Sequence, residues 1–318
     1  MNSLLNLKKR RAIELGQMEA WLTQGLDARI LRHDRILRPL LQSFLRMAGL
    51  LERGNKNARV PVVRTLHLTF DELPRTFNGF RILHISDLHI DGNPSLVAPL
   101  AELLSQVDVD LCVLTGDFRF ATYGPCENIY PLLKKLLLSI RSRHGVVGVL
   151  GNHDWAEQIQ PLEELGIRML MNSGFGIHLE GKELWVSGVD DPHYYRTDDI
   201  HAALSGSSDS SFKILLAHSP DIYKEAADAG VNLYLCGHTH GGQICLPKLP
   251  RPLLLNARCS RQFAKGGWKY GQMRGYTTAG AGTSLLDVRF HCPAEVALIE
   301  LLSSEHNIVA HQFQPKTT

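Results

Sequence analysis

The sequence predicts a layered α/β fold with mixed β-sheets. Short apolar segments rich in β-branched residues recur from about residue 60 onward, and polar or Gly-containing stretches separate them. Helical segments fit between the earlier strands, whereas later strands follow one another directly. The chain has 318 residues, of which 44% are hydrophobic and 21% charged. This size and composition suit a soluble protein with one large domain and an appendage.

The first 60 residues predict helices. Pro39 should kink this region or start a second helix there, and the polar stretch 54–57 predicts a break. We therefore expect a partly amphipathic helical arm over residues 1–59 and one large domain over residues 60–318. Apolar residues recur close to helical spacing at Ile30, Leu37, Leu41, Phe44, Ala48 and Leu51.

The large domain contains segments with strand character and segments with helical character. Strands are expected at residues 60–70, 80–86, 109–115, 145–150, 183–189, 212–217, 231–236 and 294–301. Helices are expected at residues 94–106, 127–143 and 158–165.

The arm is basic and the rest of the chain is mildly acidic. Met1 to Val60 contain 12 Lys and Arg against 5 Asp and Glu, about +7, which leaves 34 − 12 = 22 basic and 32 − 5 = 27 acidic residues elsewhere. A basic amphipathic arm could lie on an anionic membrane surface or could pack on its own domain, and the sequence leaves both open. No nucleic-acid partner is expected, because aromatic residues for base stacking are sparse in the arm.

The sequence predicts a cytoplasmic protein. If its arm binds a membrane, we expect a peripheral protein on the inner face of the plasma membrane. No run approaches the roughly 20 apolar residues that cross a bilayer. The basic run 8–11 resembles the start of a twin-arginine signal, but no apolar stretch follows it. The six cysteines form no CxxC pair and are expected to be reduced.

Polar side chains of metal-binding type stand where predicted strands end. Since the carboxyl ends of strands meet at one edge of an α/β sheet, these side chains should converge. Carboxylate, amide oxygen and imidazole without thiolate suit Mn²⁺, Fe²⁺ or Zn²⁺. The residues are Asp87, His89, Asp117, Asn152, His153, His218, His238 and His240.

Each of these motifs is weak alone, but their order is specific. The succession Asp87-x-His89, Gly116-Asp117, Gly151-Asn152-His153-Asp154, His218 and Gly237-His238-Thr239-His240 resembles the calcineurin-like metallophosphoesterases from about Val60 to Leu302. Residues 271–301 are similar to a bacterial branch that includes phosphodiesterases and hydrolases of UDP-2,3-diacylglucosamine, a lipid A precursor. Leu286-Asp287-Val288 departs from that branch's pattern.

The resemblance implies a four-layer α/β/β/α sandwich of two mixed sheets with a helical N-terminal arm. It also implies a catalytic domain that holds two divalent metal ions, with Mn²⁺ the first expectation and Fe²⁺ or Zn²⁺ the alternatives. The implied roles are Asp87, His89 and His240 on the first metal, Asn152, His218 and His238 on the second, Asp117 bridging both, and His153 facing the phosphate as catalyst. Members that orient this His with an Asp have one shortly after Gly-Asp, and residues 118–121 supply none.

The implied reaction is hydrolysis of a phosphodiester or phosphoanhydride by metal-bound hydroxide. Two substrate classes remain open: a membrane lipid-linked diphosphate such as UDP-2,3-diacylglucosamine, or soluble nucleotides and general diesters. A non-catalytic scaffold on the same fold is disfavoured because the ligand set is complete. Arg119 is a candidate for substrate binding, and a structural or rim role is expected for Asp190, Asp191 and His193.

Overall fold

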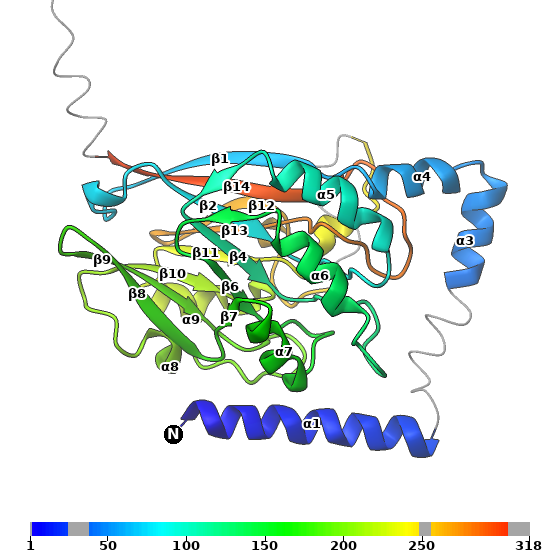
Figure 1. The fold of residues 1–318 in the computed structure, drawn as a ribbon, viewed down its shortest axis with the longest axis horizontal. Coiled ribbons are helices and arrows are strands. Elements are labelled where there is room, and N and C mark those ends of the chain that lie inside the picture. Colours follow the sequence, from blue (N-terminus) through cyan, green and yellow to red (C-terminus); the bar gives the residue numbers. More distant parts are fainter. Residues whose placement is uncertain (1, 25–37, 248–255, 305–318) are drawn as a thin grey trace, which may run out of the picture.

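Two six-stranded β-sheets pack face to face in the computed structural model, which describes residues 2–24, 38–247 and 256–304 (Figure 1). The first sheet has the order β1 (Val62–Phe70), β14 (Glu295–Ser303), β2 (Phe80–Ile85), β4 (Leu111–Thr115), β6 (Val146–Val149) and β7 (Ile167–Met169). The second has the order β12 (Gly266–Tyr270), β13 (Met273–Thr277), β11 (Leu233–Cys236), β10 (Phe212–Leu216), β9 (Lys182–Gly188) and β8 (Ser173–Leu179). A separate pair joins β3 (Asp108–Val109) to β5 (Arg141–Ser142).

Both sheets are mixed, with parallel strands at their centres. In the first sheet β2, β4, β6 and β7 are parallel, and β14 runs antiparallel to β2. In the second sheet β9, β10, β11 and β13 are parallel, and β8 and β12 are antiparallel edge strands. The carboxyl ends of the central strands of each sheet therefore reach a common edge.

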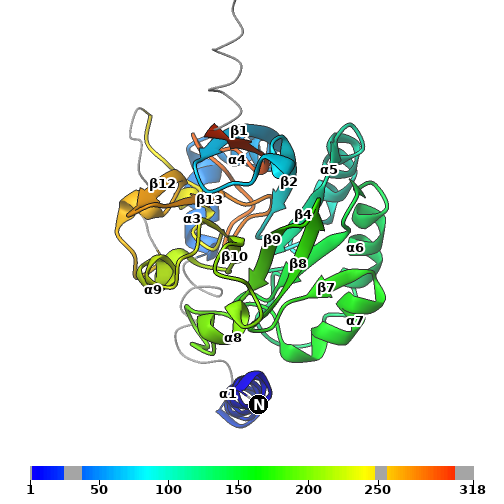
Figure 2. The ribbon, with the colours of Figure 1, turned by 90° about the vertical axis from the view of Figure 1, so that its left-hand side faces the viewer.

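Helices cover the outer face of each sheet (Figure 2). On the first sheet lie α5 (Val97–Leu104), α6 (Ile129–Leu137) and α7 (Ile159–Glu164), and on the second lie α8 (Ile200–Leu204) and α9 (Tyr223–Asp228). Short 3₁₀ turns are η2 (Arg75–Phe77), η3 (Pro94–Leu96), η4 (Ala156–Gln158), η5 (Pro220–Ile222), η6 (His240–Gly242) and η7 (Arg261–Phe263). This arrangement confirms the predicted four-layer α/β/β/α sandwich.

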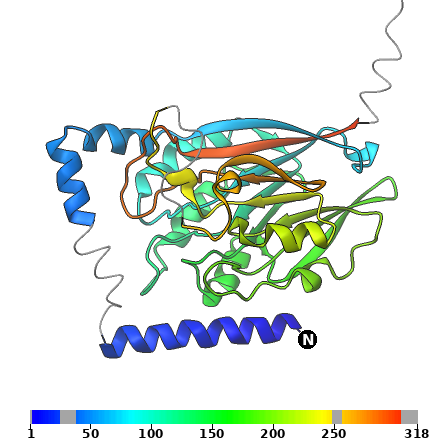
Figure 3. The same cartoon turned by 180° about the vertical axis from the view of Figure 1, so that it is seen from behind.

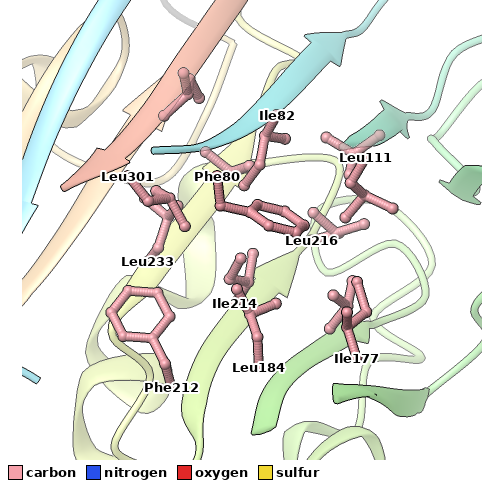
Figure 4. Close-up of a cluster of buried hydrophobic side chains, with 14 of the residues drawn as sticks. Phe80, Ile82, Leu111, Ile177, Leu184, Phe212, Ile214, Leu216, Leu233 and Leu301 are labelled. Atoms are coloured by element: carbon pink, nitrogen blue, oxygen red, sulfur yellow. The ribbon is translucent and has the colours of Figure 1, made fainter. Parts of the chain in front are cut away.

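The main hydrophobic core lies between the two sheets (Figure 4). Ile82 and Leu111 from the first sheet and Ile214 and Leu233 from the second are fully buried there. Apolar β-branched and Leu side chains on both inner faces remove their area from water, at roughly 25 cal/mol per Å². This core holds the two sheets, and hence their carboxyl edges, in a fixed relation.

Three strands that the sequence did not predict are rich in glycine. β8, β12 and β13 contain Gly174 and Gly176, Gly266 and Gly267, and Gly275. Gly275 pairs with Trp268, whose ring would lie 2.2 Å from a Cβ at that position. The tryptophan thus covers a bare backbone that intrinsic β-propensity disfavours, so tertiary packing decides the local structure.

Among the described residues, three helices precede the first strand: α1 (Asn2–Gln24), α3 (Arg38–Met47) and α4 (Leu51–Ala58). Figure 3 shows α3 and α4 at one end of the sandwich and α1 along one side of it. Helix α3 begins beside Pro39, as predicted, whereas residues 30–37 of the predicted periodic stretch lie outside the described residues. No described helix is long and apolar enough to cross a bilayer.

The predicted polar break at residues 54–57 is wrong, because these residues lie inside α4. A Cβ on Gly54 would meet Val288 and Phe290 at 2.8 Å, so the helix packs closely on that segment. Asn57 also donates a hydrogen bond to the carbonyl of Arg289 over 2.9 Å. These contacts outweigh the low helix propensity of Gly and Asn. The division between residues 1–59 and 60–318 stays a prediction.

Candidate metal centre

Loops at the carboxyl ends of five strands bring the predicted site residues together. Each loop follows a central strand of one sheet, so the site lies across the seam between the two sheets. The first sheet supplies Asp87 and His89 after β2, Asp117 after β4, and Asn152 and His153 after β6, while the second supplies His218 after β10 and His238 and His240 after β11.

One group of ligand-type atoms comprises Asp87, His89 and His240. Their nearest side-chain atoms lie within 4.8 Å of one another, and all three residues are buried. Nε2 of His240 lies 3.2 Å from Nε2 of His89 and 3.6 Å from Oδ1 of Asp87. The backbone N–H of His238 donates to the Asp87 carboxylate over 3.0–3.1 Å, which fixes that carboxylate.

A second group comprises Asp117, His218 and His238, with Asn152 beside it. Nδ1 of His238 lies 3.2 Å from Nε2 of His218. Oδ1 of Asn152 lies 2.9 Å from the same His218 nitrogen. Two imidazoles, a carboxylate and an amide oxygen thus face one small volume.

Asp117 lies between the two groups. Its Oδ1 accepts a hydrogen bond from the backbone N–H of His153 over 2.8 Å. Its Oδ2 lies 3.5 Å from Nε2 of His89 and 3.3 Å from Nε2 of His218. One carboxylate oxygen therefore faces histidines of both groups, which is the geometry that a shared ligand needs.

Backbone carbonyls select the tautomers of these imidazoles. Nδ1 of His89 bonds the carbonyl of Arg119 over 2.8 Å, and Nδ1 of His218 bonds that of Thr115 over 2.7 Å. A carbonyl only accepts, so each Nδ1 carries a proton and each Nε2 faces inward. Lone pairs that face other imidazole nitrogens at 3.2 Å require a proton or a cation between them, so the residues fit divalent metal ions.

Burial and neighbouring charges hold four side chains of the site in their metal-binding forms. Burial lowers the pKa of His89 to about 3 and lowers the pKa values of His238 and His240 well below their usual value, so these rings are neutral. Burial alone would raise the pKa of Asp117, but the neighbouring His218 and His153 hold it well below its usual range. Asp117 is therefore ionised.

The raised pKa values of Asp87 and His218 indicate that the site lacks positive charge. Burial, with help from the charge of Asp117, raises the pKa of Asp87 to about 6. Burial opposes the protonation of His218, yet Asp117 raises the pKa of His218 to about 10. Two buried carboxylates thus attract a proton onto the neighbouring imidazole, and a divalent cation would take that proton's place.

His153 is oriented by the main chain. Its Nδ1 bonds the carbonyl of Phe120 over 2.6 Å, and its Nε2 lies 3.9 Å from Oδ2 of Asp117. Its side chain is 19% exposed, whereas those of His89 and His218 are 1% and 0% exposed. A backbone oxygen thus orients His153 where residues 118–121 supply no Asp side chain, and no residue type in the sequence reveals this contact.

The loops adopt tight conformations at the site. Asp87, His89, Asp117, His238 and His240 all have positive φ, between 40° and 70°. Such angles are costly for non-glycine residues and cluster at functional sites. A Cβ on Gly151 would meet Oδ1 of Asp117 at 2.2 Å, so only glycine allows these two loops to approach.

Arg119 is buried rather than presented at the surface, with 1% exposure. Its Nη2 donates to the carbonyls of Tyr123 and Gly124 over 2.8 and 2.9 Å, and its own carbonyl orients His89. In this conformation its guanidinium holds the 119–124 loop. A role in substrate binding stays a prediction.

Asp190, Asp191 and His193 lie outside the two ligand groups. Asp191 accepts hydrogen bonds from the backbone N–H groups of residues 193–195, and Asp190 accepts one from Thr197. Nδ1 of His193 lies 2.6 Å from Oδ2 of Asp221, and its ring is centred 4.2 Å from that of His238. These contacts are those of residues that support the site from its rim.

Two further residues support the site and were not singled out from the sequence. The buried carboxylate of Asp154 accepts hydrogen bonds from the backbone N–H groups of Asp117, Phe118 and Gly151 over 2.7–2.9 Å. Arg10, from helix α1, donates to the carbonyls of Gly151 and Asp154. Asp154 had a signal, since it completes the Gly-Asn-His-Asp motif. Arg10 had none, because the loop that it bonds lies more than 140 positions away.

Comparisons with known proteins agree with this geometry. The profile of the calcineurin-like phosphoesterase family matches residues 80–242, about half of the chain. The metallophosphoesterase YkuE of Bacillus subtilis is 29% identical over 245 residues, covering 73% of this chain and 82% of YkuE. YkoQ of the same organism is 28% identical, covering 79% of this chain and 94% of YkoQ. Phosphodiesterase YaeI of Escherichia coli is 27% identical, covering 70% of this chain and 82% of YaeI.

Proposed function

The chain belongs to the calcineurin-like phosphoesterase family and is a metal-dependent phosphoesterase, and on that premise we propose that it hydrolyses a phosphodiester or phosphoanhydride at the seam between its two sheets. The observation that carries this proposal is the convergence of buried carboxylates and imidazoles within 4.8 Å of one another. Carboxylate and imidazole together suit Mn²⁺, Fe²⁺ or Zn²⁺, and of these we propose Mn²⁺ first.

The proposed ligands follow the two groups of atoms. Asp87, His89 and His240 would hold one ion. Asn152, His218 and His238 would hold the other. The oxygen of Asp117 that faces both groups would be shared, and the N–H groups of His153 and His238 keep the two carboxylates oriented.

Two ions held by these residues would supply Lewis acidity and would make water a nucleophile near neutral pH. His153 would act beside them as the catalyst rather than as a ligand. The carbonyl of Phe120 holds its Nδ1 proton, so Nε2 is the atom that can exchange a proton with the leaving oxygen. Its partial exposure lets that nitrogen meet a substrate.

We propose a membrane lipid-linked diphosphate, such as UDP-2,3-diacylglucosamine, as the substrate. Helix α3 supports this choice. Leu41 and Leu45 face the domain, whereas Leu40, Phe44 and Met47 form a second apolar row that is 61–82% exposed. Exposed Arg38 and Arg46 flank this row, and apolar side chains between basic ones suit the surface of an anionic membrane.

The first residue of α3 contacts a loop of the site. The guanidinium carbon of Arg38 lies 5.6 Å from the centre of the Phe120 ring, and the carbonyl of Phe120 orients His153. A membrane held by α3 would thus present lipid headgroups near the catalyst. This arrangement would place the enzyme as a peripheral protein on the inner face of the plasma membrane.

A soluble phosphodiesterase acting on nucleotides or general diesters is the second candidate. It is favoured by the similarity to YaeI, which is described as a phosphodiesterase. Both candidate substrates would be hydrolysed at the same site, and they differ only in the groups attached to the phosphate. No nucleic-acid partner is proposed.

Two substrates tested side by side separate the candidates. The Mn²⁺-loaded protein would be assayed on UDP-2,3-diacylglucosamine in anionic vesicles and on bis(p-nitrophenyl) phosphate in solution. We expect a kcat/KM for the lipid that exceeds that for the diester by at least tenfold. Turnover of the diester alone would reject the lipid substrate, and turnover of neither would reject both candidates.

A further inference from the structure

Helix α1 docks on the catalytic domain through charged residues. Among the α1 side chains that the structure describes, residues 5–19, Arg10 and Glu14 are the buried ones. Leu5 and Leu15 are 65% and 67% exposed. An amphipathic helix that only covers a core buries its apolar stripe instead. The contacts of Arg10 and Glu14 therefore require a different explanation.

Arg10 joins loops from both sheets. Its Nη1 donates to the carboxylate of Asp190, in the loop after β9 of the second sheet. Its Nη2 donates to the carbonyls of Gly151, over 3.0 Å, and Asp154, in the loop after β6 of the first sheet. The guanidinium also lies 3.9 Å from the centre of the Tyr195 ring.

The loop after β6 carries the proposed ligand Asn152 and the proposed catalyst His153. One nitrogen of Arg10 bonds the carbonyls at both ends of the four residues Gly151–Asp154. From the other side, the Asp154 carboxylate bonds the N–H groups of Gly151 and Asp117. Arg10 on one side and the Asp154 carboxylate on the other thus fix the backbone of these four residues.

Glu14 completes the arrangement one helical turn later. Its Oε1 accepts a hydrogen bond from Nε of Arg10 over 2.8 Å and another from the backbone N–H of Ala156 over 2.9 Å. Burial opposes the charge of Arg10, but Asp190, Tyr195 and Glu14 raise its pKa above the usual value. Arg10 is therefore a permanent cation. Its planar guanidinium donates hydrogen bonds from Nε, Nη1 and Nη2 to different partners, which the single ammonium of a lysine cannot reproduce.

The loop that holds Asp190 also touches the second ligand group. His193 follows Asp190 closely, and its ring lies 4.2 Å from that of His238. Arg10 therefore connects the Asn152 side of that group, on the first sheet, to the His238 side, on the second sheet. Groups behind metal ligands orient those ligands and tune the affinity of the ion.

We propose that Arg10 is a positioning residue that sets Asn152 and His153 against the histidines of the second sheet, so that helix α1 forms part of the active site. This inference rests on the proposed metal-dependent function. It predicts that the second ion binds tightly only when α1 is docked.

The test compares Arg10→Met with Arg11→Met. Arg11 is the next residue on the helix and its side chain is exposed, so the control makes the same chemical change without touching the loop. Mn²⁺ affinity and stoichiometry would be measured well below the unfolding temperature of every variant. We expect Arg10→Met to weaken binding of one of the two ions about 10–100-fold, and Arg11→Met to leave both affinities unchanged.

Amide hydrogen exchange supplies a readout that does not depend on activity. In Arg10→Met the N–H groups of residues 151–156 should exchange faster than in the wild type and in Arg11→Met. If Arg10→Met does not fold, Arg10→Lys keeps the charge and should still weaken one ion more than Arg11→Met does. A variant at Arg10 that loses only thermal stability, with wild-type Mn²⁺ affinity and exchange, would overturn the inference. A wild-type chain that binds no divalent metal would overturn the metal centre itself.

Discussion

Asp117 is the side chain that both halves of the proposed site share. Replacing it with Ala removes the negative charge that would separate two cations, so we expect loss of activity and a metal content of one ion or none per chain. Metal content after dialysis and turnover of a soluble diester would be measured. Asp108→Ala, at an exposed carboxylate of β3, is the control. Two bound ions with near-normal turnover in Asp117→Ala would show that Asp117 bridges nothing.

His153 separates catalysis from metal binding. His153→Ala should keep both ions and lower kcat by roughly 10²–10⁴-fold, as expected when a positioned acid is removed. The loss should be smaller for p-nitrophenyl esters, whose leaving group needs little protonation. His178→Ala, a histidine whose side chain is 68% exposed, serves as control. A His153→Ala protein that lost an ion would identify His153 as a ligand instead.

The convergence of the candidate side chains could be predicted from the sequence more fully than the groups that support them. Asp87, Asn152 and His218 stand directly after apolar strands, so their position at the site edge follows from strand order. By contrast, the orientation of His153 depends on the carbonyl of Phe120, an atom that every residue possesses. The contact of Arg10 with the loop after β6 depends on how α1 docks, and no local pattern encodes that.

At the scale of elements, the apolar row of α3 makes the membrane proposal testable without truncating the arm. Phe44→Glu with Met47→Glu should weaken binding to anionic vesicles at least tenfold, since burying one such side chain contributes about 1.5–3 kcal/mol. Leu15→Glu, at an equally exposed position on α1, is the control.

The α3 substitutions should raise the KM for a lipid substrate in vesicles and spare a soluble diester. Vesicle binding by the unaltered chain should also weaken as salt rises, because Arg38 and Arg46 contribute by charge. If the two substitutions leave vesicle binding unchanged, α3 is not the surface that contacts the membrane.

Strand prediction succeeded where packing and propensity agree. The central strands β2, β4, β10 and β11 consist mostly of apolar residues, and all were predicted. β12 and β13 were not, because glycines lower their propensity, and the packing of the Trp268 ring over Gly275 is not visible in a local pattern. The helical course of residues 54–57 was hidden for a similar reason, since Gly54 fits the narrow gap beside Val288.

At the scale of the whole molecule, the proposed ions would join the two sheets as well as serve the reaction. Each ligand group takes side chains from both sheets, so an ion bound there adds a link across the seam. A ligand that binds only the folded state at 100 times its Kd stabilises that state by about 2.7 kcal/mol.

Chelation should therefore lower the unfolding midpoint. Removing metal with EDTA should reduce Tm by on the order of 5 °C, and excess Mn²⁺ should restore it. Asp117→Ala should show a smaller response to EDTA than the wild type. Identical melting curves with and without chelator would mean that no ion contributes to folding.

The positive φ angles at Asp87, His89, Asp117, His238 and His240 have a consequence for how the family can change over time. Each such angle costs of order 1 kcal/mol or more for a side-chain-bearing residue, and glycine would relieve it. Selection for thermal stability alone would therefore replace these five residues with glycine first. Variants gathered from a heat-tolerance screen of the metal-free protein should be enriched in substitutions that abolish hydrolysis, so the chemistry of this enzyme persists only under continuous selection for turnover.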